Sequence, residues 1–158
     1  MSDRHGDYAF SVENGAANFA ELEPLYRQHY AEMQARLSKE GITVSDYNPR
    51  WDVYFDYWRK GHLINYVVRK NGVPAGLSNL YITHDMHNRD LIAQEDTIYL
   101  LPEHRNGTGR RFSIFILADL KRRGVKRLHV EALTDLRVAK LWQRMGFKHV
   151  AHSMTYTF

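Results

Sequence analysis

The chain has 158 residues, of which 44% are hydrophobic and 25% charged, with ten glycines, four prolines and no cysteine. This composition is typical of one folded domain and excludes a disordered or collagen-like chain. Without cysteine there is no disulfide framework, no thiolate zinc site and no cysteine nucleophile. Because the amino terminus is polar and no apolar run is long enough for a membrane span, we expect a cytoplasmic protein without a signal peptide.

The net charge of +4 is unevenly distributed along the chain. Between Glu103 and Arg127 there are eight Lys or Arg residues and two acidic ones, a local charge of +6, so the rest of the chain sums to −2. A basic segment of this kind predicts an anionic partner, which can be a nucleic acid, a membrane surface or a phosphorylated cofactor. Composition does not distinguish these three.

The first two thirds of the chain alternate between two helical patterns and several strand patterns. A strand is predicted at 8–12, and an apolar stripe from Phe19 to Leu37 predicts a long amphipathic helix. An aromatic-rich stretch at 51–58 is typical of a second, short helix. Three strands are then predicted, with an Asn71-Gly72 hairpin turn and a polar tip at 84–90 between them: 63–69, 73–82 and 91–101.

The last third of the chain predicts a strand–helix–strand crossover. A helix begins near Thr108 and ends in a basic turn before Gly124, and a strand follows at 128–132. Another helix is predicted at 137–144, and alternating residues predict a last strand at 150–158. This order favours a parallel crossover within a mixed sheet, so we expect a single α+β domain over residues 1–158.

A glycine-containing turn, Pro102–Arg110, joins a strand to a helix, and such a junction can bind phosphate. Its glycines, Gly107 and Gly109, let the backbone approach an anion, and the first amides of the helix have no intrahelical partners. The arginines at 105, 110 and 111 add positive charge there. The turn is neither a dinucleotide fingerprint nor a P-loop, and a purely steric role for the glycines is the alternative.

Two motifs resemble those of the GCN5-related N-acetyltransferases (GNAT). One is Leu100-Leu101-Pro102-Glu103-His104-Arg105 followed by Gly107 and Gly109, and the other is Trp142 followed by the Gly146-Phe147 pair. The order of the predicted elements agrees, so the resemblance covers nearly the whole chain, and it is greatest to small members from phages and mobile elements. It implies a mixed, mostly antiparallel twisted sheet of about six or seven strands flanked by about four helices.

The same resemblance implies direct transfer of an acetyl group from acetyl-CoA to a primary amine of a protein or small molecule, without a metal. It assigns cofactor contacts to Leu100, Leu101, Arg105, Asn106, Gly107, Thr108, Gly109, Arg110 and Trp142. The turn departs from the family pattern because the spacing from Arg105 to Gly107 is one residue short.

The residue at position 142 is a second departure from the family. Many members have a tyrosine there that protonates the leaving thiolate, whereas the indole N–H of Trp142 donates a hydrogen bond but is not a useful acid. Either the thiolate leaves unprotonated, or the activity is degenerate, or one of four other groups supplies the proton: Tyr99, His149, His152 or Tyr156.

An acceptor amine must lose a proton before it attacks, and Glu95 is the first candidate for the base, with Asp96 the second. Strand alternation predicts that Glu95 shares a face with Thr97, Tyr99 and Leu101, and that Asp96 shares the other with Ile98 and Leu100. The carboxylate that faces the cleft is expected to have a raised pKa. The alternative is that both are solvated charges at a strand edge.

His84 and His87 lie in the polar tip, and we expect them to contact the acceptor rather than a metal, since no third ligand has suitable spacing. A homodimer and an amine-bearing acceptor are the expected partners, with no membrane. The alternative function is a catalytically degenerate domain that binds a nucleic acid or a protein. Nucleic acid is the less favoured partner, because no known binding motif or aromatic stacking platform accompanies the basic residues.

Overall fold

The computed structural model describes residues 2–5, 7–133 and 135–158. Five strands form the body of a mixed sheet: β2 (Tyr8–Glu13), β3 (Leu63–Lys70), β4 (Val73–His84), β5 (Leu91–Leu100) and β6 (Arg127–His129). A short strand, β1 (Ser2–His5), pairs with β2 and extends the sheet at that edge. The helices are α1 (Phe19–Lys39), α2 (Trp51–Lys60), α3 (Thr108–Arg122) and α4 (Leu136–Arg144), and a 3-10 turn, η1, spans Pro102–His104.

The strand directions follow from the connections. Strands β2 to β5 are antiparallel neighbours, and the β3–β4 hairpin turns at Asn71 and Gly72, both with positive φ, as the sequence predicts. Strand β6 runs parallel to β5 because α3 carries the chain back across the sheet between them. The α+β class, the mixed sheet and the four helices are therefore as expected.

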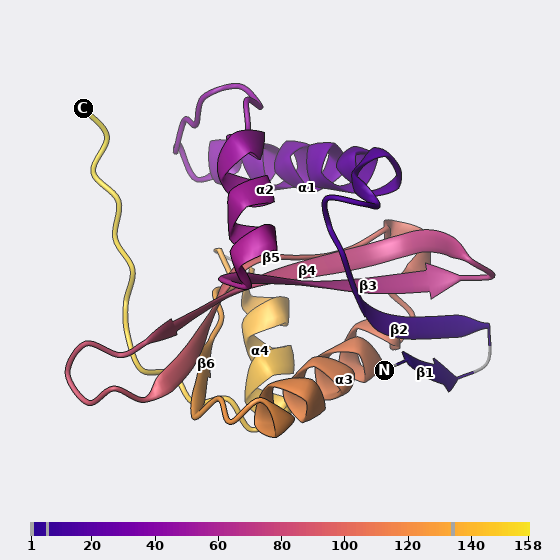
Figure 1. The fold of residues 1–158 in the computed structure, drawn as a ribbon. Helices are drawn as coiled ribbons and strands as arrows, with labels where there is room; N and C mark the ends of the chain where they lie inside the picture. Colours follow the sequence, from indigo (N-terminus) through magenta and orange to yellow (C-terminus); the bar gives the residue numbers. More distant parts are fainter. Residues whose placement is uncertain (1, 6, 134) are drawn as a thin grey trace.

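The strand predicted at 150–158 is wrong, so the described residues form five strands in the body of the sheet and the short β1 at its edge, at the low end of the expected six or seven. Residues 145–158 have no regular helix or strand, and four of the apolar side chains there are exposed: Val150, Met154, Tyr156 and Phe158. In Figure 1 this segment runs away from the sheet. Alternation indicates which side chains share a face, but a strand also needs a neighbour for its backbone hydrogen bonds.

Helices cover both faces of the sheet, with α1 and α2 on one side and α3 and α4 on the other (Figure 1). Phe112 and Phe115 of α3 pack with Phe10 and Tyr66 in one core cluster. Leu22 and Tyr26 of α1 pack with residues of β3 and β4 in the second cluster. The two faces of β5 therefore lie in different environments. The chemistry open to Glu95 and Asp96 depends on which face each side chain occupies.

Much of the basic segment is engaged within the fold. Asp119, only 5% exposed, accepts hydrogen bonds from Arg122 and Arg123, each at 2.6 Å, and from the hydroxyl of Tyr66 at 2.8 Å. Arg127 pairs with two carboxylates of the β4–β5 tip. These three arginines are thus paired with carboxylates of the chain itself, whereas the exposed Arg110 lies at the start of α3, beside the glycine turn.

Candidate active site

A β-bulge in β5 sets the orientation of the two candidate bases. Leu80 of β4 pairs with Glu95, and Asn79, the residue before Leu80, pairs with Thr97. Asp96 therefore has no partner in β4 and is the extra residue of the bulge. A bulge shifts the alternation by one position beyond it. The predicted faces were therefore wrong: Glu95 faces the α3 and α4 side together with Ile98 and Leu100. Tyr99 and Leu101 pack on the α1 side.

Immediately before Glu95, β5 and β6 separate. Their last paired residues are Gln94 and His129, and beyond them the Glu95 carboxylate accepts a hydrogen bond from the backbone N–H of Glu131 at 3.0 Å. We call this opening the β5–β6 gap, bounded by residues 95–100 and 130–131. It explains why the strand predicted at 128–132 ends at His129.

The backbone of β5 presents a free edge to this gap. The Leu101 N–H donates to the Ala75 carbonyl of β4, so the backbone groups of Tyr99 also point toward β4. In an antiparallel pair the residues between, Ile98 and Leu100, direct their N–H and C=O groups to the opposite edge. The Leu100 carbonyl already accepts a hydrogen bond from Arg105. The Leu100 N–H and both backbone groups of Ile98 are left for a ligand that extends along β5.

Glu95 is partly buried, and its pKa is raised to about 7. Burial is the main cause, and the negative charges of Glu131 and Asp96 raise the pKa further, whereas the hydrogen bond from the Glu131 amide lowers it. A carboxyl group with this pKa is half ionised near neutral pH and can both accept and release a proton. The carboxylate lies at the mouth of the gap, as a general base requires.

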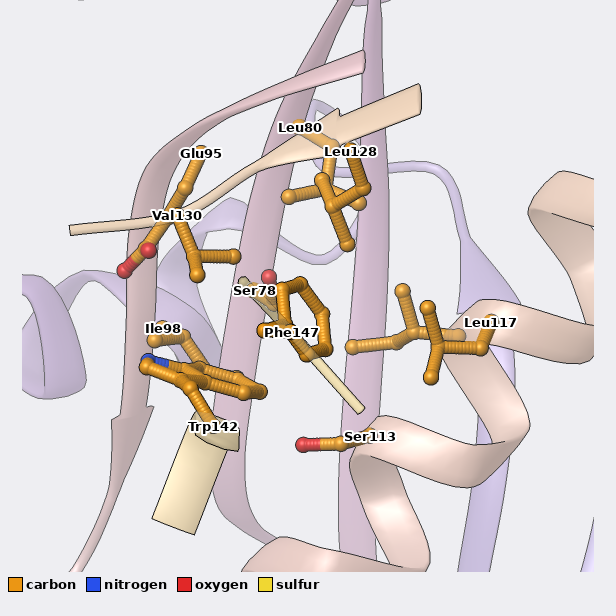
Figure 2. A pocket seen from close by; sticks show the side chains of 11 residues that line it. Ser78, Leu80, Glu95, Ile98, Ser113, Leu117, Leu128, Val130, Trp142 and Phe147 are labelled. Carbon is orange, nitrogen blue, oxygen red and sulfur yellow. The ribbon is translucent and has the colours of Figure 1, made fainter. Parts of the chain in front are cut away.

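A small, mostly apolar hollow lies beside the gap. It is lined by Glu95 and Ile98 of β5, Val130 after β6, Trp142 of α4 and Phe147 (Figure 2). Trp142 therefore lies beside Glu95, and the cofactor contact expected of it stays a prediction. Apolar side chains around one carboxylate favour its neutral form, and they exclude water from a small reactive group bound beside it.

At the other end of the gap, the N-terminus of α3 offers unpaired backbone amides. Gly107 caps the helix with φ of 90°, a conformation that glycine adopts easily, and no side chain caps the first turn, which also has no acidic residue. A Cβ at Gly109 would lie 3.3 Å from Leu100 Cδ1, so the helix approaches β5 closely here. Asn106 accepts a hydrogen bond from the buried Thr108 hydroxyl and fixes the turn. This is an anion-binding geometry.

Arg105 does not face this turn. Its Nε donates to the Leu100 carbonyl at 2.9 Å, and its guanidinium binds Glu32 of α1 at 2.7 Å. The Tyr99 hydroxyl donates to the same carboxylate at 2.6 Å. Although burial alone would raise it, the pKa of Glu32 lies below its usual value because of these two hydrogen bonds and the arginine charge.

Replacing Arg105 with glutamine is therefore expected to change the dissociation constant for acetyl-CoA by less than about threefold. The guanidinium is used to join the turn to α1, and an exposed pair of this kind contributes about 0–1 kcal/mol to stability. Isothermal titration calorimetry measures the binding constant. A loss of more than tenfold in affinity would show instead that Arg105 contacts the ligand.

The second candidate base lies on the opposite face from Glu95. Asp96 accepts hydrogen bonds from the hydroxyls of Tyr54, Tyr81 and Thr97, between α2 and the sheet. Tyr99 lies on the same face, and burial together with the Glu32 carboxylate raises its pKa, which disfavours loss of its proton. The structure thus brings Glu95 and Trp142 together and holds Asp96 and Tyr99 apart from them.

The remaining predicted side chains are exposed. His84 and His87 are exposed in the β4–β5 tip, and His84 is four register positions, about 13 Å, from the Leu80–Glu95 pair. The three alternative acids of the C-terminal segment, His149, His152 and Tyr156, are exposed. Within the described residues there is no cluster of three or more potential metal ligands, and no helix is long and apolar enough to cross a membrane.

Sequence reasoning missed three participants. The Glu131 amide donates to the Glu95 carboxylate, Glu32 binds Arg105, and the buried Ser78, whose hydroxyl has no hydrogen-bond partner among the described residues, lines the hollow. None carries a sequence signal, because the residues that each one meets are distant in the chain. Only the strand pairing and the position of α1 bring them into place.

The comparisons with known proteins agree with this geometry. A family model described as Acetyltransferase (GNAT) family matches residues 22–147, and the chain belongs to this family. No curated protein matches the sequence.

Several solved structures share the fold at low sequence identity. An aminoglycoside acetyltransferase from an uncultured soil metagenomic sample superposes with a TM-score of 0.75 at 10% identity, covering 99% of both chains. A ribosomal-protein-alanine N-acetyltransferase from Brucella melitensis has a TM-score of 0.69 at 14% identity, over 96% of this chain and 99% of its own. The aminoglycoside N-acetyltransferase AAC(6')-Iy in complex with CoA has a TM-score of 0.69 at 15% identity, over 100% of this chain and 99% of its own.

Proposed function

We propose that the chain is a single-domain, acetyl-CoA-dependent N-acetyltransferase that acetylates a primary amine. The observation that carries this proposal is the partly buried Glu95 carboxylate, with a pKa of about 7, at the point where β5 and β6 separate. The free edge of β5 and the uncapped start of α3 lie on the same path and support the binding of an extended, anionic cosubstrate. Family membership supports acetyl-CoA as that cosubstrate.

The proposed cosubstrate pose follows from these two features. The pyrophosphate of acetyl-CoA lies on the first amides of α3, beside Arg110. The pantetheine arm runs along β5, paired with the backbone of Leu100 and Ile98, and brings the acetyl group to Glu95. From Leu100 to Glu95 is about 16 Å along the strand, so the two ends of the cosubstrate are held apart by an extended arm.

The reaction then needs one proton acceptor and no covalent enzyme intermediate. An alkyl ammonium has a pKa of about 10.4, so roughly one molecule in a few thousand is the free amine at pH 7. As the amine nitrogen bonds to the acetyl carbon, the Glu95 carboxylate takes its proton and the carbon–sulfur bond breaks with its electron pair on sulfur. The products are the acetamide and CoA.

The acceptor is a primary amine on either a small molecule or a protein. The structural neighbours include enzymes that are named for aminoglycosides and for the alanine of a ribosomal protein, which represent these two classes. Both classes present an amine that is mostly protonated at neutral pH. Both therefore need the base that Glu95 provides.

The first test of the proposal is ligand-induced stabilisation. At 100 times its dissociation constant, a ligand that binds only the native state stabilises it by about 2.7 kcal/mol, which raises Tm by about 5–10 °C for a chain of this size. We expect such a rise with acetyl-CoA and none with acetate. Release of free thiol is then measured with aminoglycosides, polyamines and short peptides as acceptors. No change of Tm at millimolar acetyl-CoA would contradict the proposal.

A further inference from the structure

The indole N–H of Trp142 is a buried donor without an acceptor. The side chain is only 7% exposed, and its Nε1 has no hydrogen-bond partner among the residues that the structure describes. Trp58, in contrast, donates its Nε1–H to Asn79 at 3.2 Å. A buried donor left unpaired is costly, so such a group in a folded protein calls for an explanation, and a bound ligand is one.

The position of the indole indicates which ligand this is. The Trp142 ring packs against Phe147, with 5.0 Å between centroids, and lines the hollow beside the gap together with Glu95 and Ile98. Figure 2 shows the nitrogen at the end of the ring that is turned toward Ile98 and β5, away from Ser113 and Leu117 of α3. The donor therefore faces the part of the gap next to the carboxylate.

We propose that Trp142 Nε1–H donates a hydrogen bond to the sulfur of acetyl-CoA and stabilises the thiolate as it leaves. This inference rests on the function proposed above. The arm enters from the α3 end and its acetyl group reaches Glu95, so the sulfur, which precedes the acetyl carbon on the arm, lies between Leu100 and Glu95. Ile98 occupies that stretch of β5, and Trp142 lies beside it.

The hydrogen bond replaces an acid at this step. As the new carbon–nitrogen bond forms, the amine proton goes to Glu95, the carbon–sulfur bond breaks and its electron pair stays on sulfur. The indole N–H stabilises this anion without giving up its proton, since indole is a donor only. The CoA thiolate then takes a proton from solvent after release.

The direct test compares CoA with desulfo-CoA, which lacks only the sulfur. In ¹H–¹⁵N spectra of the protein labelled at indole nitrogens, CoA should move the Trp142 Nε1–H resonance downfield, and desulfo-CoA should not. The Trp58 resonance is the internal control, because its donor is already paired. If both ligands bind and move the Trp142 resonance equally, the bond to sulfur is disproved while the proposed function stands. If neither ligand binds, the proposed function itself fails.

Binding constants of a variant provide the second readout. Trp142→Phe keeps an aromatic ring against Phe147 and removes the N–H. We expect wild-type protein to prefer CoA over desulfo-CoA about fivefold, and Trp142→Phe to lose that preference. Trp51→Phe, which removes an indole on the opposite face of the sheet, should retain it. Equal preferences in wild-type protein and Trp142→Phe would overturn the inference.

Turnover separates a catalytic contact from a packing role. With the best acceptor found by screening, Trp142→Phe should lower kcat about tenfold at an unchanged KM for acetyl-CoA, because the bond strengthens as charge develops on sulfur. Trp142→Tyr, which differs from the phenylalanine variant by one hydroxyl donor, should restore kcat. If phenylalanine and tyrosine at this position give the same kcat, the residue only packs.

Discussion

Replacing Glu95 with glutamine should lower kcat at pH 7 by about 100-fold and leave the dissociation constant for acetyl-CoA within about twofold of the wild-type value. A positioned general base contributes about 10²–10⁴-fold to the rate, and glutamine cannot accept the proton. The amide oxygen of glutamine can still accept the hydrogen bond from the Glu131 N–H, so the local structure is expected to persist. Thiol release and calorimetry measure the two quantities.

The pH profile identifies the carboxylate more specifically. Because its pKa is about 7, Glu95 is protonated at lower pH and cannot act as a base, so wild-type kcat/KM should fall about tenfold per pH unit below 7. Glu95→Gln should lose this inflection. Asp96→Asn is the matched control, and it should keep the inflection at a slightly lower pH, because the Asp96 charge raises the pKa of Glu95. If Asp96→Asn loses the inflection instead, the base is Asp96.

The same raised pKa predicts that stability falls as the pH rises, whereas activity increases. The folded state favours the protonated form of Glu95, so this stabilisation is complete below the ordinary pKa of 4.5 and is lost as the pH rises through about 7. The loss amounts to at most about 3 kcal/mol. Glu95→Gln should therefore gain stability relative to the wild-type protein between pH 5 and pH 8 in urea unfolding. A difference that does not change with pH would contradict the raised pKa.

Replacing Arg110 with glutamate should weaken acetyl-CoA binding about 30-fold. The change places a negative charge where the proposed pose has the pyrophosphate, at a cost of about 2 kcal/mol, which is typical of a charge interaction at a partly buried helix end. A glutamate in the first turn of a helix also interacts favourably with the helix dipole, so the Tm without ligand should not fall. Calorimetry and thermal unfolding separate binding from folding here.

Lys121→Glu is the control for overall charge. It makes the same change of two units at the other end of α3, where the exposed lysine belongs to the last turn. Acetyl-CoA affinity should then change less than about threefold. If both variants weaken binding equally, the anion is attracted by net charge and not held at the start of the helix.

The sequence predicts most of the fold because local patterns carry it. Helix periodicity, the Asn71-Gly72 turn and the strand before the glycine turn each depend on neighbours within a few residues, and all are present in the structure. The alternation at 150–158 is equally regular, but a strand there needs a neighbouring strand that the local pattern does not specify. Local pattern thus predicts elements better than it predicts their pairing.

The sequence predicts the candidate site only in part, because the site depends on strand pairing and on contacts between distant residues. The bulge at Asp96 leaves no trace in the residue pattern, yet it places Glu95 on the face of Ile98 and Leu100. Arg105 was expected at the phosphates, but its partner is Glu32, 73 residues away.

The local charge of +6 between Glu103 and Arg127 predicts an external anionic partner. The structure shows that four of its arginines bind carboxylates of the chain itself, namely those of Glu32, Asp119, Asp85 and Asp90. Counting charges along the sequence does not reveal such internal pairs. With these arginines engaged, the start of α3 is the better candidate for an anion, which favours a nucleotide cosubstrate over a nucleic acid.

A crystal structure with acetyl-CoA bound would show which face and which edge of the sheet hold the thioester. We expect the pyrophosphate on the first amides of α3, the pantetheine arm along Leu100 and Ile98, and the acetyl carbon beside the Glu95 carboxylate. An acetyl group on the opposite face, next to Asp96 and the α2 tyrosines, or a cosubstrate bound outside the β5–β6 gap, would contradict the proposed pose.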